Sequence, residues 1–218
     1  MTNLNTVATL AAETLLKYRM DNLPIYPQKI IQDHPRAALL SFADISASAG
    51  IPRDHFVSAV DPIGGVAAAY VYNQPDGPYY LLAFNKTEPY SRIRFALACE
   101  VANILLVHNG TKPEAVRLEE VFHFARHLCY PRAMIRLCEE LDIPLTEDNL
   151  SAIAGSYGTY LQDLQRVPGS VVPPALNRQI RDMLRPYMKG LRAAFPFSSS
   201  GPLLDLSSYM EGYDDECC

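Results

Sequence analysis

The most constraining feature of the sequence is an apolar segment with a single acidic residue near its middle. Residues 92–108 run Arg-Ile-Arg-Phe-Ala-Leu-Ala-Cys-Glu-Val-Ala-Asn-Ile-Leu-Leu-Val-His, and over residues 95–107 apolar side chains surround the helix that this sequence predicts. Such a helix is buried. Glu100 therefore needs a polar partner, a metal ion, an open cleft or a raised pKa, which makes it a candidate site residue. The alternative is a structural ion pair with Arg92 or Arg94.

The composition is typical of a soluble globular protein of ordinary size. A chain of 218 residues with 49% apolar residues is long enough to bury a core, and it contains no apolar run of membrane-spanning length. The net charge of -5 argues against direct nucleic-acid binding through overall charge. The cysteines are odd in number and lack the spacing of a disulfide framework, which predicts reduced thiols in the cytoplasm. They are Cys99, Cys129, Cys138, Cys217 and Cys218.

The periodicity of the sequence predicts an α+β fold. Apolar residues at helical spacing indicate an N-terminal helix over residues 5–19 and a second helix over 41–49. Residues 66–73 and 79–85 are rich in β-branched and aromatic types and flank a Pro-Asp-Gly turn sequence, which predicts a β-hairpin. From Arg92 onward the pattern is helical. The predicted order is an N-terminal helix, a small β-sheet and a helical C-terminal part.

We expect one domain over residues 1–195, with its core at 60–165, followed by a flexible acidic tail over 196–218. An amphipathic helix is predicted at 174–192. Its basic edge is either a docking face for an acidic partner or nucleic acid, or a solvated face, and we favour the solvated face because charged helix faces are common. This edge consists of Arg178, Arg181, Arg185, Lys189 and Arg192.

The hairpin and the helix that follows it match a known signature. A strand ends in Asn85, and a short linker leads into the segment that carries Cys99, Glu100 and Asn103. This order resembles the ImmA/IrrE metallopeptidase family, in which a strand ending in Asn precedes R-x-R-F-T-L-A-H-E-L-G-H-x-L-L. In that family the two histidines bind zinc and the Glu is the general base. The resemblance places Cys99 at the first His, Glu100 at the Glu and Asn103 at the second His.

A second block follows at the distance that this family has. Residues 120–131, Glu-Val-Phe-His-Phe-Ala-Arg-His-Leu-Cys-Tyr-Pro, are similar to the family's E-A-N-x-F-A-x-x-L-L-x-P, whose Glu completes the metal site. Glu120 occupies that position. Residues 156–161, Ser-Tyr-Gly-Thr-Tyr-Leu, look like a later element of the family. The resemblance thus implies a zincin-like metallopeptidase fold.

The same comparison implies a degenerate zinc site. Two residues four apart lie on one face of a helix, which is why H-E-x-x-H binds one zinc ion. Cys99 can ligate as a thiolate, but the amide of Asn103 is a poor ligand. Only Cys99 and Glu120 then remain where a catalytic zinc site usually has three protein ligands. We therefore expect no cofactor. The alternative is that His123 and His127, on the same helix face as Glu120, replace the lost imidazoles.

Three possibilities for the function remain open. The first is a non-catalytic protein-binding or regulatory module; the resemblance implies prophage or mobile-element regulation and a helix-turn-helix repressor as partner. The second is a zinc-dependent metallopeptidase that cleaves such a repressor. It would use Glu100 as general base and Cys99, Glu120 and one histidine as ligands. A third possibility is that the inherited cleft has no role and only surfaces such as the basic edge matter.

Overall fold

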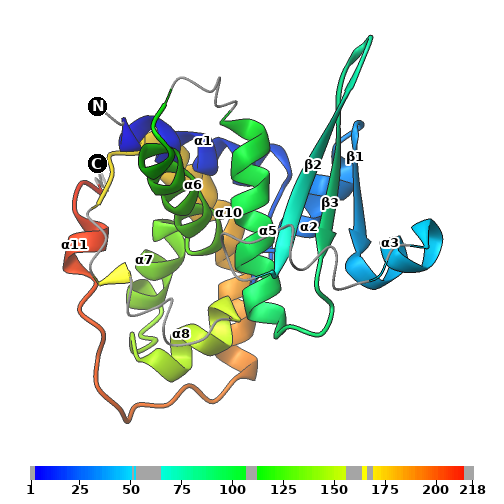
Figure 1. The fold of residues 1–218 in the computed structure, drawn as a ribbon. Helices are drawn as coiled ribbons and strands as arrows, with labels where there is room; N and C mark the ends of the chain where they lie inside the picture. The colour runs from blue at the N-terminus through cyan, green and yellow to red at the C-terminus, as the bar shows by residue number, and fades with distance from the viewer. Residues whose placement is uncertain are drawn as a thin grey trace. The chain divides into compact units, whose positions relative to one another are not determined.

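The computed structural model describes residues 3–50, 52, 65–106, 112–155, 164–165 and 169–213. The chain divides into two compact units: unit 1 comprises Met1–Ile25 and Glu114–Cys218, and unit 2 comprises Tyr26–Pro113. Helices occur in both units and the sheet lies in unit 2, which confirms the mixed α+β class (Figure 1). In the described ranges, no helix combines the length and the apolar character needed to cross a membrane. The single domain over 1–195 stays a prediction.

Unit 2 contains a three-stranded sheet in the order β1-β3-β2. Its strands are β1 (Ala37–Ser41), β2 (Ala67–Gln74) and β3 (Gly77–Phe84). β2 and β3 pair antiparallel, from Ala67 opposite Phe84 to Gln74 opposite Gly77, which confirms the predicted hairpin. β1 runs parallel to β3 and is not among the predicted strands.

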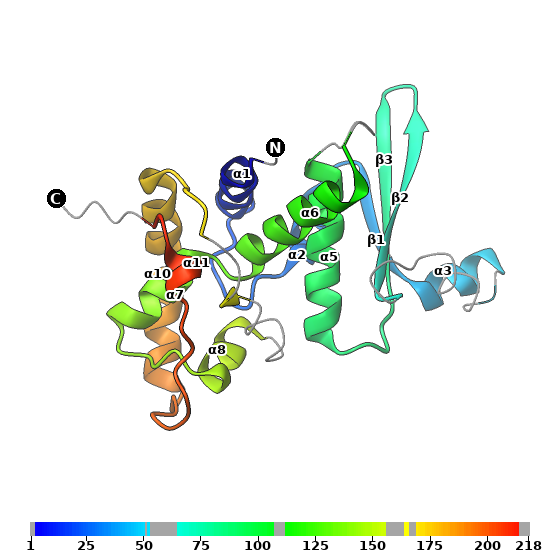
Figure 2. The same ribbon diagram turned by 60° about the vertical axis from the view of Figure 1, so that its left-hand side comes forward.

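Three described helices accompany this sheet: α2 (Pro27–Asp33), α3 (Phe42–Ala49) and α5 (Tyr90–Leu105). The predicted helix at 41–49 is confirmed by α3, which begins at a capping box formed by Ser41 and Asp44. The cap directs Phe42 and Ile45 of α3 into a small apolar cluster on the sheet. α5 packs against both hairpin strands and against α2. Figure 2 shows α5 and α2 on one side of the sheet and α3 on the other.

Unit 1 is helical over most of its described length. Its described helices are α1 (Leu4–Lys17), α6 (Glu114–Cys129), α7 (Arg132–Glu140), α8 (Glu147–Ala154), α10 (Pro174–Ala194) and α11 (Ser207–Met210). α1 packs against α6 and α10, and α10 packs against α7. The predicted helices at 5–19 and 174–192 are confirmed by α1 and α10, with ends that differ slightly.

Part of the predicted flexible tail contributes to the core of unit 1. Leu206 and Tyr209 are buried, and the backbone N–H of Ser198 donates a hydrogen bond of 3.0 Å to the Asn149 side chain. The flexibility of the tail stays a prediction, and residues 214–218 lie outside the described part. The described cysteines Cys99, Cys129 and Cys138 are buried and carry no disulfide bond.

Candidate functional site

The turn between β3 and α5 positions the first group of predicted site residues. Asn85 follows the last residue of β3, and its side-chain oxygen accepts hydrogen bonds from the backbone N–H and the hydroxyl of Thr87. Such an Asx turn redirects the chain locally. α5 then begins at Tyr90, directly after Pro89, whose fixed φ suits a helix start. The strand-terminal Asn85 of the sequence motif thus sets the entry into the Glu100 helix.

Glu100 lies in the middle of α5 and is only 9% exposed, as its apolar surroundings predict. Its carboxylate accepts a hydrogen bond of 3.2 Å from the side-chain amide of Asn103. It also accepts a hydrogen bond from the backbone of Ala69 in β2. Burial raises the pKa of Glu100, while the hydrogen bonds from Asn103 and Ala69 oppose that rise. The carboxylate is therefore held by the helix and by the neighbouring strand.

The contacts described for Glu100 do not include the alternative ion pair with Arg92 or Arg94. The guanidinium of Arg92 pairs with Glu88, one turn earlier, at 2.7 Å. This pair joins the first turn of α5 to the segment just before the helix and is partly exposed, so it contributes little to stability. The hydrogen bonds to Glu100 come instead from groups that carry no formal charge, the amide of Asn103 and the peptide of Ala69.

The residues of unit 2 at the zinc positions that the resemblance implies are Cys99 and Asn103. Cys99 is fully buried. Asn103 is exposed, but its amide nitrogen is engaged with Glu100 and an amide is a poor zinc ligand. In the described part of unit 2, no three His, Cys, Asp or Glu side chains converge on one point.

The second group of predicted site residues lies on α6 of unit 1, where Glu120, His123 and His127 are all buried. The ring centroids of His123 and His127 are 4.6 Å apart. His123 Nε2 shares a hydrogen bond of 2.7 Å with the hydroxyl of Ser170. Although the three residues share a helix, they do not form a group able to hold a metal ion.

The two histidines are held in their neutral form. Burial lowers the pKa of His123 to about 4, and the positive charges of Arg126 and Arg132 add to this effect. Burial also lowers the pKa of His127 well below its ordinary value, with further contributions from His123 and the same arginines. His127 Nε2 is buried without a hydrogen-bond partner among the described residues.

Arg132, at the start of α7, joins this histidine pair to the C-terminal segment. Its guanidinium donates to the backbone carbonyls of Tyr209, at 2.6 Å, and of Ser170 and Glu211. The Tyr209 ring lies 5.3 Å from the His127 ring, and its hydroxyl donates to the Tyr130 carbonyl at 2.7 Å. Arg132, Ser170 and Tyr209 are not among the residues that the sequence singles out, because no periodicity links them.

Glu100 and Glu120 belong to different units, so the metal site that the resemblance assembles from both helices stays a prediction. The later block at 156–161 lies outside the described residues. Within each unit, the structure brings Asn103 to Glu100 and His123 to His127. Both contacts join side chains that the sequence marks as candidate site residues.

Comparisons with protein-family models, with curated proteins and with solved structures find no match to this chain.

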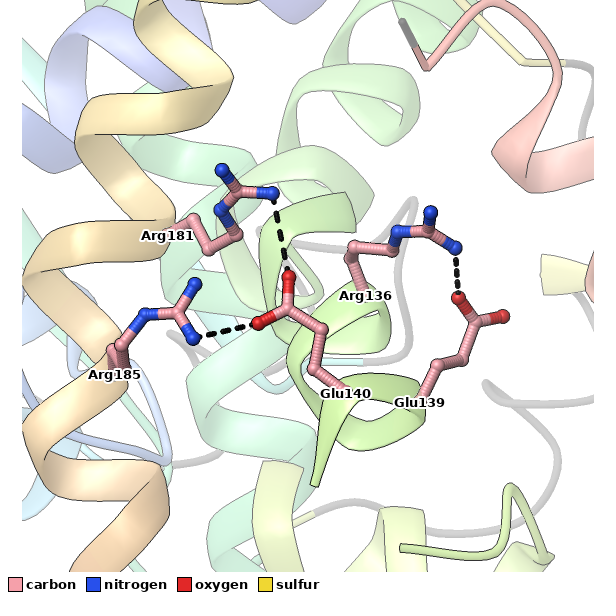
Figure 3. Close-up of polar contacts among 5 residues, drawn as sticks. All are labelled: Arg136, Glu139, Glu140, Arg181 and Arg185. Atoms are coloured by element: carbon pink, nitrogen blue, oxygen red, sulfur yellow. Dashed lines mark hydrogen bonds and ion pairs between the residues drawn. The ribbon is translucent and has the colours of Figure 1, made fainter. Parts of the chain in front are cut away.

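The predicted basic edge of α10 is partly neutralised within unit 1. Glu140 of α7 pairs with Arg181 at 3.3 Å and with Arg185 at 2.7 Å (Figure 3). Arg192 donates to the carbonyl of Leu141 at 3.3 Å. These contacts use three of the basic side chains to tie α10 to α7 and its end. These contacts favour a solvated helix face over a docking face for an acidic partner or nucleic acid.

Proposed function

We propose that this chain is a degenerate relative of the ImmA/IrrE metallopeptidases, with a zincin-like fold, that binds a protein partner without cleaving it. The two sequence blocks around Glu100 and Glu120 support the family relation. The hydrogen bond from Asn103 to Glu100 supports the loss of catalysis, and it is the observation on which the proposal rests.

A general base must present an acceptor oxygen to the proton that it removes. In this chain the Glu100 carboxylate is buried and already accepts hydrogen bonds from Asn103 and from the β2 backbone. The amide of Asn103 occupies the position of a zinc-binding imidazole and serves as a hydrogen-bond donor to the acid. An ancestral catalytic pair has thereby become a structural polar contact.

The proposed partner is a helix-turn-helix repressor, in a setting of prophage or mobile-element regulation. The family resemblance supplies this class of partner. The acidic balance of the chain, with a net charge of -5, favours protein over nucleic acid as the bound molecule. We expect the exposed face of α5 around Asn103 to take part in binding.

The proposal is tested with a purified helix-turn-helix repressor encoded in the same genome. Isothermal titration calorimetry measures its binding to the untagged chain, and electrophoresis of the mixture with added zinc measures cleavage. We expect binding with both chains intact. We also expect Asn103→Lys to weaken binding at least tenfold, while Gln179→Lys, an exposed change of the same charge on α10, leaves it unchanged. Cleavage that a chelator stops and Glu100→Gln abolishes would show an active peptidase instead.

A further inference from the structure

β2 forms an open edge of the sheet in unit 2. In the strand order β1-β3-β2, β3 lies on one side of β2, and no described strand lies on its other side. The backbone N–H of Asn85 donates a hydrogen bond of 2.8 Å to the Val66 carbonyl. Counted from Val66, every second residue of β2 therefore points its backbone N–H and C=O groups toward β3. The alternate residues Ala69, Val71 and Asn73 direct their N–H and C=O groups outward.

This outer edge is closed at one point and open beyond it. At Ala69 the backbone is hydrogen-bonded to the Glu100 carboxylate. Further along, the side chains of Val71 and Tyr72 are 57% and 50% exposed. In Figure 1 the tip of the hairpin extends away from the helices of unit 2. Val71 and Asn73 therefore present strand hydrogen-bonding groups at an accessible edge.

The edge lacks the features that keep exposed strands from pairing. Proteins protect such edges with charged side chains, proline or bulges. β2 reads Ala-Ala-Ala-Tyr-Val-Tyr-Asn-Gln, which contains no charge and no proline. The hairpin is also held in shape, because Arg36 pairs with Asp76 in its turn at 2.7 Å and donates to the Asp76 carbonyl. A preformed, uncharged edge favours addition of another strand.

The sequence of the edge is self-complementary. Tyr70 and Tyr72 are arranged symmetrically about Val71. If two copies of β2 pair antiparallel about Val71, the two Val71 residues exchange N–H to C=O hydrogen bonds. Tyr70 of each copy then lies opposite Tyr72 of the other, and aromatic cross-strand pairs of this kind stabilise sheets. The Asn73 N–H reaches the Ala69 carbonyl of the second copy, a group that the Glu100 contact leaves available.

We propose that a second copy of this chain pairs with the β2 edge, so that two hairpins form one continuous sheet around a two-fold axis at Val71. An isologous contact of this type closes on itself and gives a dimer without further growth. Glu100 contributes by holding the backbone of Ala69, which ends the pairing of the two strands at that residue. This assembly is independent of any metal and of the repressor proposed above.

The test is the mass of the untagged chain by sedimentation equilibrium over a wide concentration range. We expect twice the monomer mass of 24.3 kDa at high concentration. Val71→Lys places two like charges opposite each other at the axis and should give the monomer at all concentrations, with unchanged circular dichroism. Pro78→Lys puts the same charge on β3, away from the edge, and should leave the dimer intact. A monomeric wild type, or a Val71→Lys variant that dimerises like the wild type, would overturn the proposal.

Amide hydrogen exchange locates the contact. Exchange at Val71 and Asn73 should slow as the concentration rises, because their N–H groups point outward and, unlike that of Ala69, are not held by Glu100. Exchange at Tyr70 and Tyr72 should be slow at every concentration, because those N–H groups bond to β3. A dimer whose Val71 exchange does not depend on concentration would place the interface elsewhere and contradict the β2 contact.

Discussion

The side-chain amide of Asn103 donates a hydrogen bond of 3.2 Å to the carboxylate of Glu100, one helical turn earlier on α5. Residues three apart on a helix face the same side, so this contact is built into the local sequence. A buried carboxylate thereby gains a hydrogen-bond donor that carries no positive charge. The contact therefore explains how α5 accommodates Glu100 in an otherwise apolar environment.

Asn103→Ala should destabilise unit 2. The variant removes a hydrogen bond to a buried carboxylate, which is worth roughly 1.5–3 kcal/mol when the acceptor is charged. It should also raise the pKa of Glu100 further, because the lost hydrogen bond favours the ionised form. Urea denaturation measures the first effect, and NMR titration of the Glu100 carboxyl carbon measures the second. An unchanged Glu100 pKa would show that the amide does not hold the carboxylate in solution.

Glu100→Gln should change the pH dependence of stability. Burial raises the pKa of Glu100 in the folded state. Because its pKa is higher in the folded chain than in the unfolded chain, Glu100 stabilises the folded state at any pH below its unfolded-state pKa. This stabilisation is lost as the pH rises through the folded-state pKa. The amide of Gln cannot ionise, so the variant should gain free energy of unfolding relative to wild type as pH rises from 4 to 7. Denaturation series in parallel over this range measure the difference, and parallel curves for both proteins would be the contrary result.

The His123–His127 pair should make unit 1 sensitive to acid. The pKa of His123 is about 4 in the folded state, against an ordinary value of 6.5. His123 therefore binds a proton more readily in the unfolded chain than in the folded chain. The stability that it contributes above pH 6.5 is lost as the pH falls toward 4, a loss of roughly 3 kcal/mol for this residue. His127→Phe removes a second group of the same kind together with an unpartnered ring nitrogen. We expect this variant to be more stable than wild type at pH 5, whereas His123→Phe should lose the hydrogen bond to Ser170 at pH 7. Equal denaturation midpoints of the wild type at pH 7.5 and pH 5 would refute the acid sensitivity.

Arg132 should anchor the C-terminal segment of unit 1. Its guanidinium donates hydrogen bonds to the backbone carbonyls of Ser170, Tyr209 and Glu211. The variant Arg132→Met removes these hydrogen bonds and leaves the carbonyls without this donor. We expect a loss of roughly 2–4 kcal/mol and faster amide exchange over residues 207–213. Arg136→Met is the matched control, because Arg136 lies on the same helix in an exposed pair with Glu139 and should cost under about 1 kcal/mol. If both variants lose the same stability, Arg132 has no special role.

The elements that the sequence predicts are those with strong periodicity or clear turn chemistry. α1, the hairpin and α10 fall in this class. The short elements were missed for identifiable reasons. α2 starts with Pro27 at its first turn, a favoured helix position, although the prolines of that region indicate a break when they are considered alone. β1 has five residues whose burial does not alternate, so it lacks the two-residue period of a half-buried strand.

The candidate site shows the same division. The burial of Glu100 follows from its apolar neighbours along the helix, and His123 and His127 are likewise buried on a helix rich in apolar residues. The contact of Glu100 with the backbone of Ala69 depends on how α5 packs against β2. The helical periodicity of the sequence does not predict that packing. Tyr209 is one aromatic residue in a segment without periodicity, so nothing in its surroundings indicates that it is buried.

The decisive measurement is the zinc content of the untagged wild-type chain, determined by inductively coupled plasma mass spectrometry after dialysis against zinc. If the chain is a peptidase relative that has lost its metal site, it should hold far less than one zinc ion per chain. The double variant Cys99→His, Asn103→His should gain zinc if the family relation holds. One zinc ion bound per wild-type chain, and lost in Glu120→Ala or His127→Ala, would instead identify a metallopeptidase with an altered set of ligands.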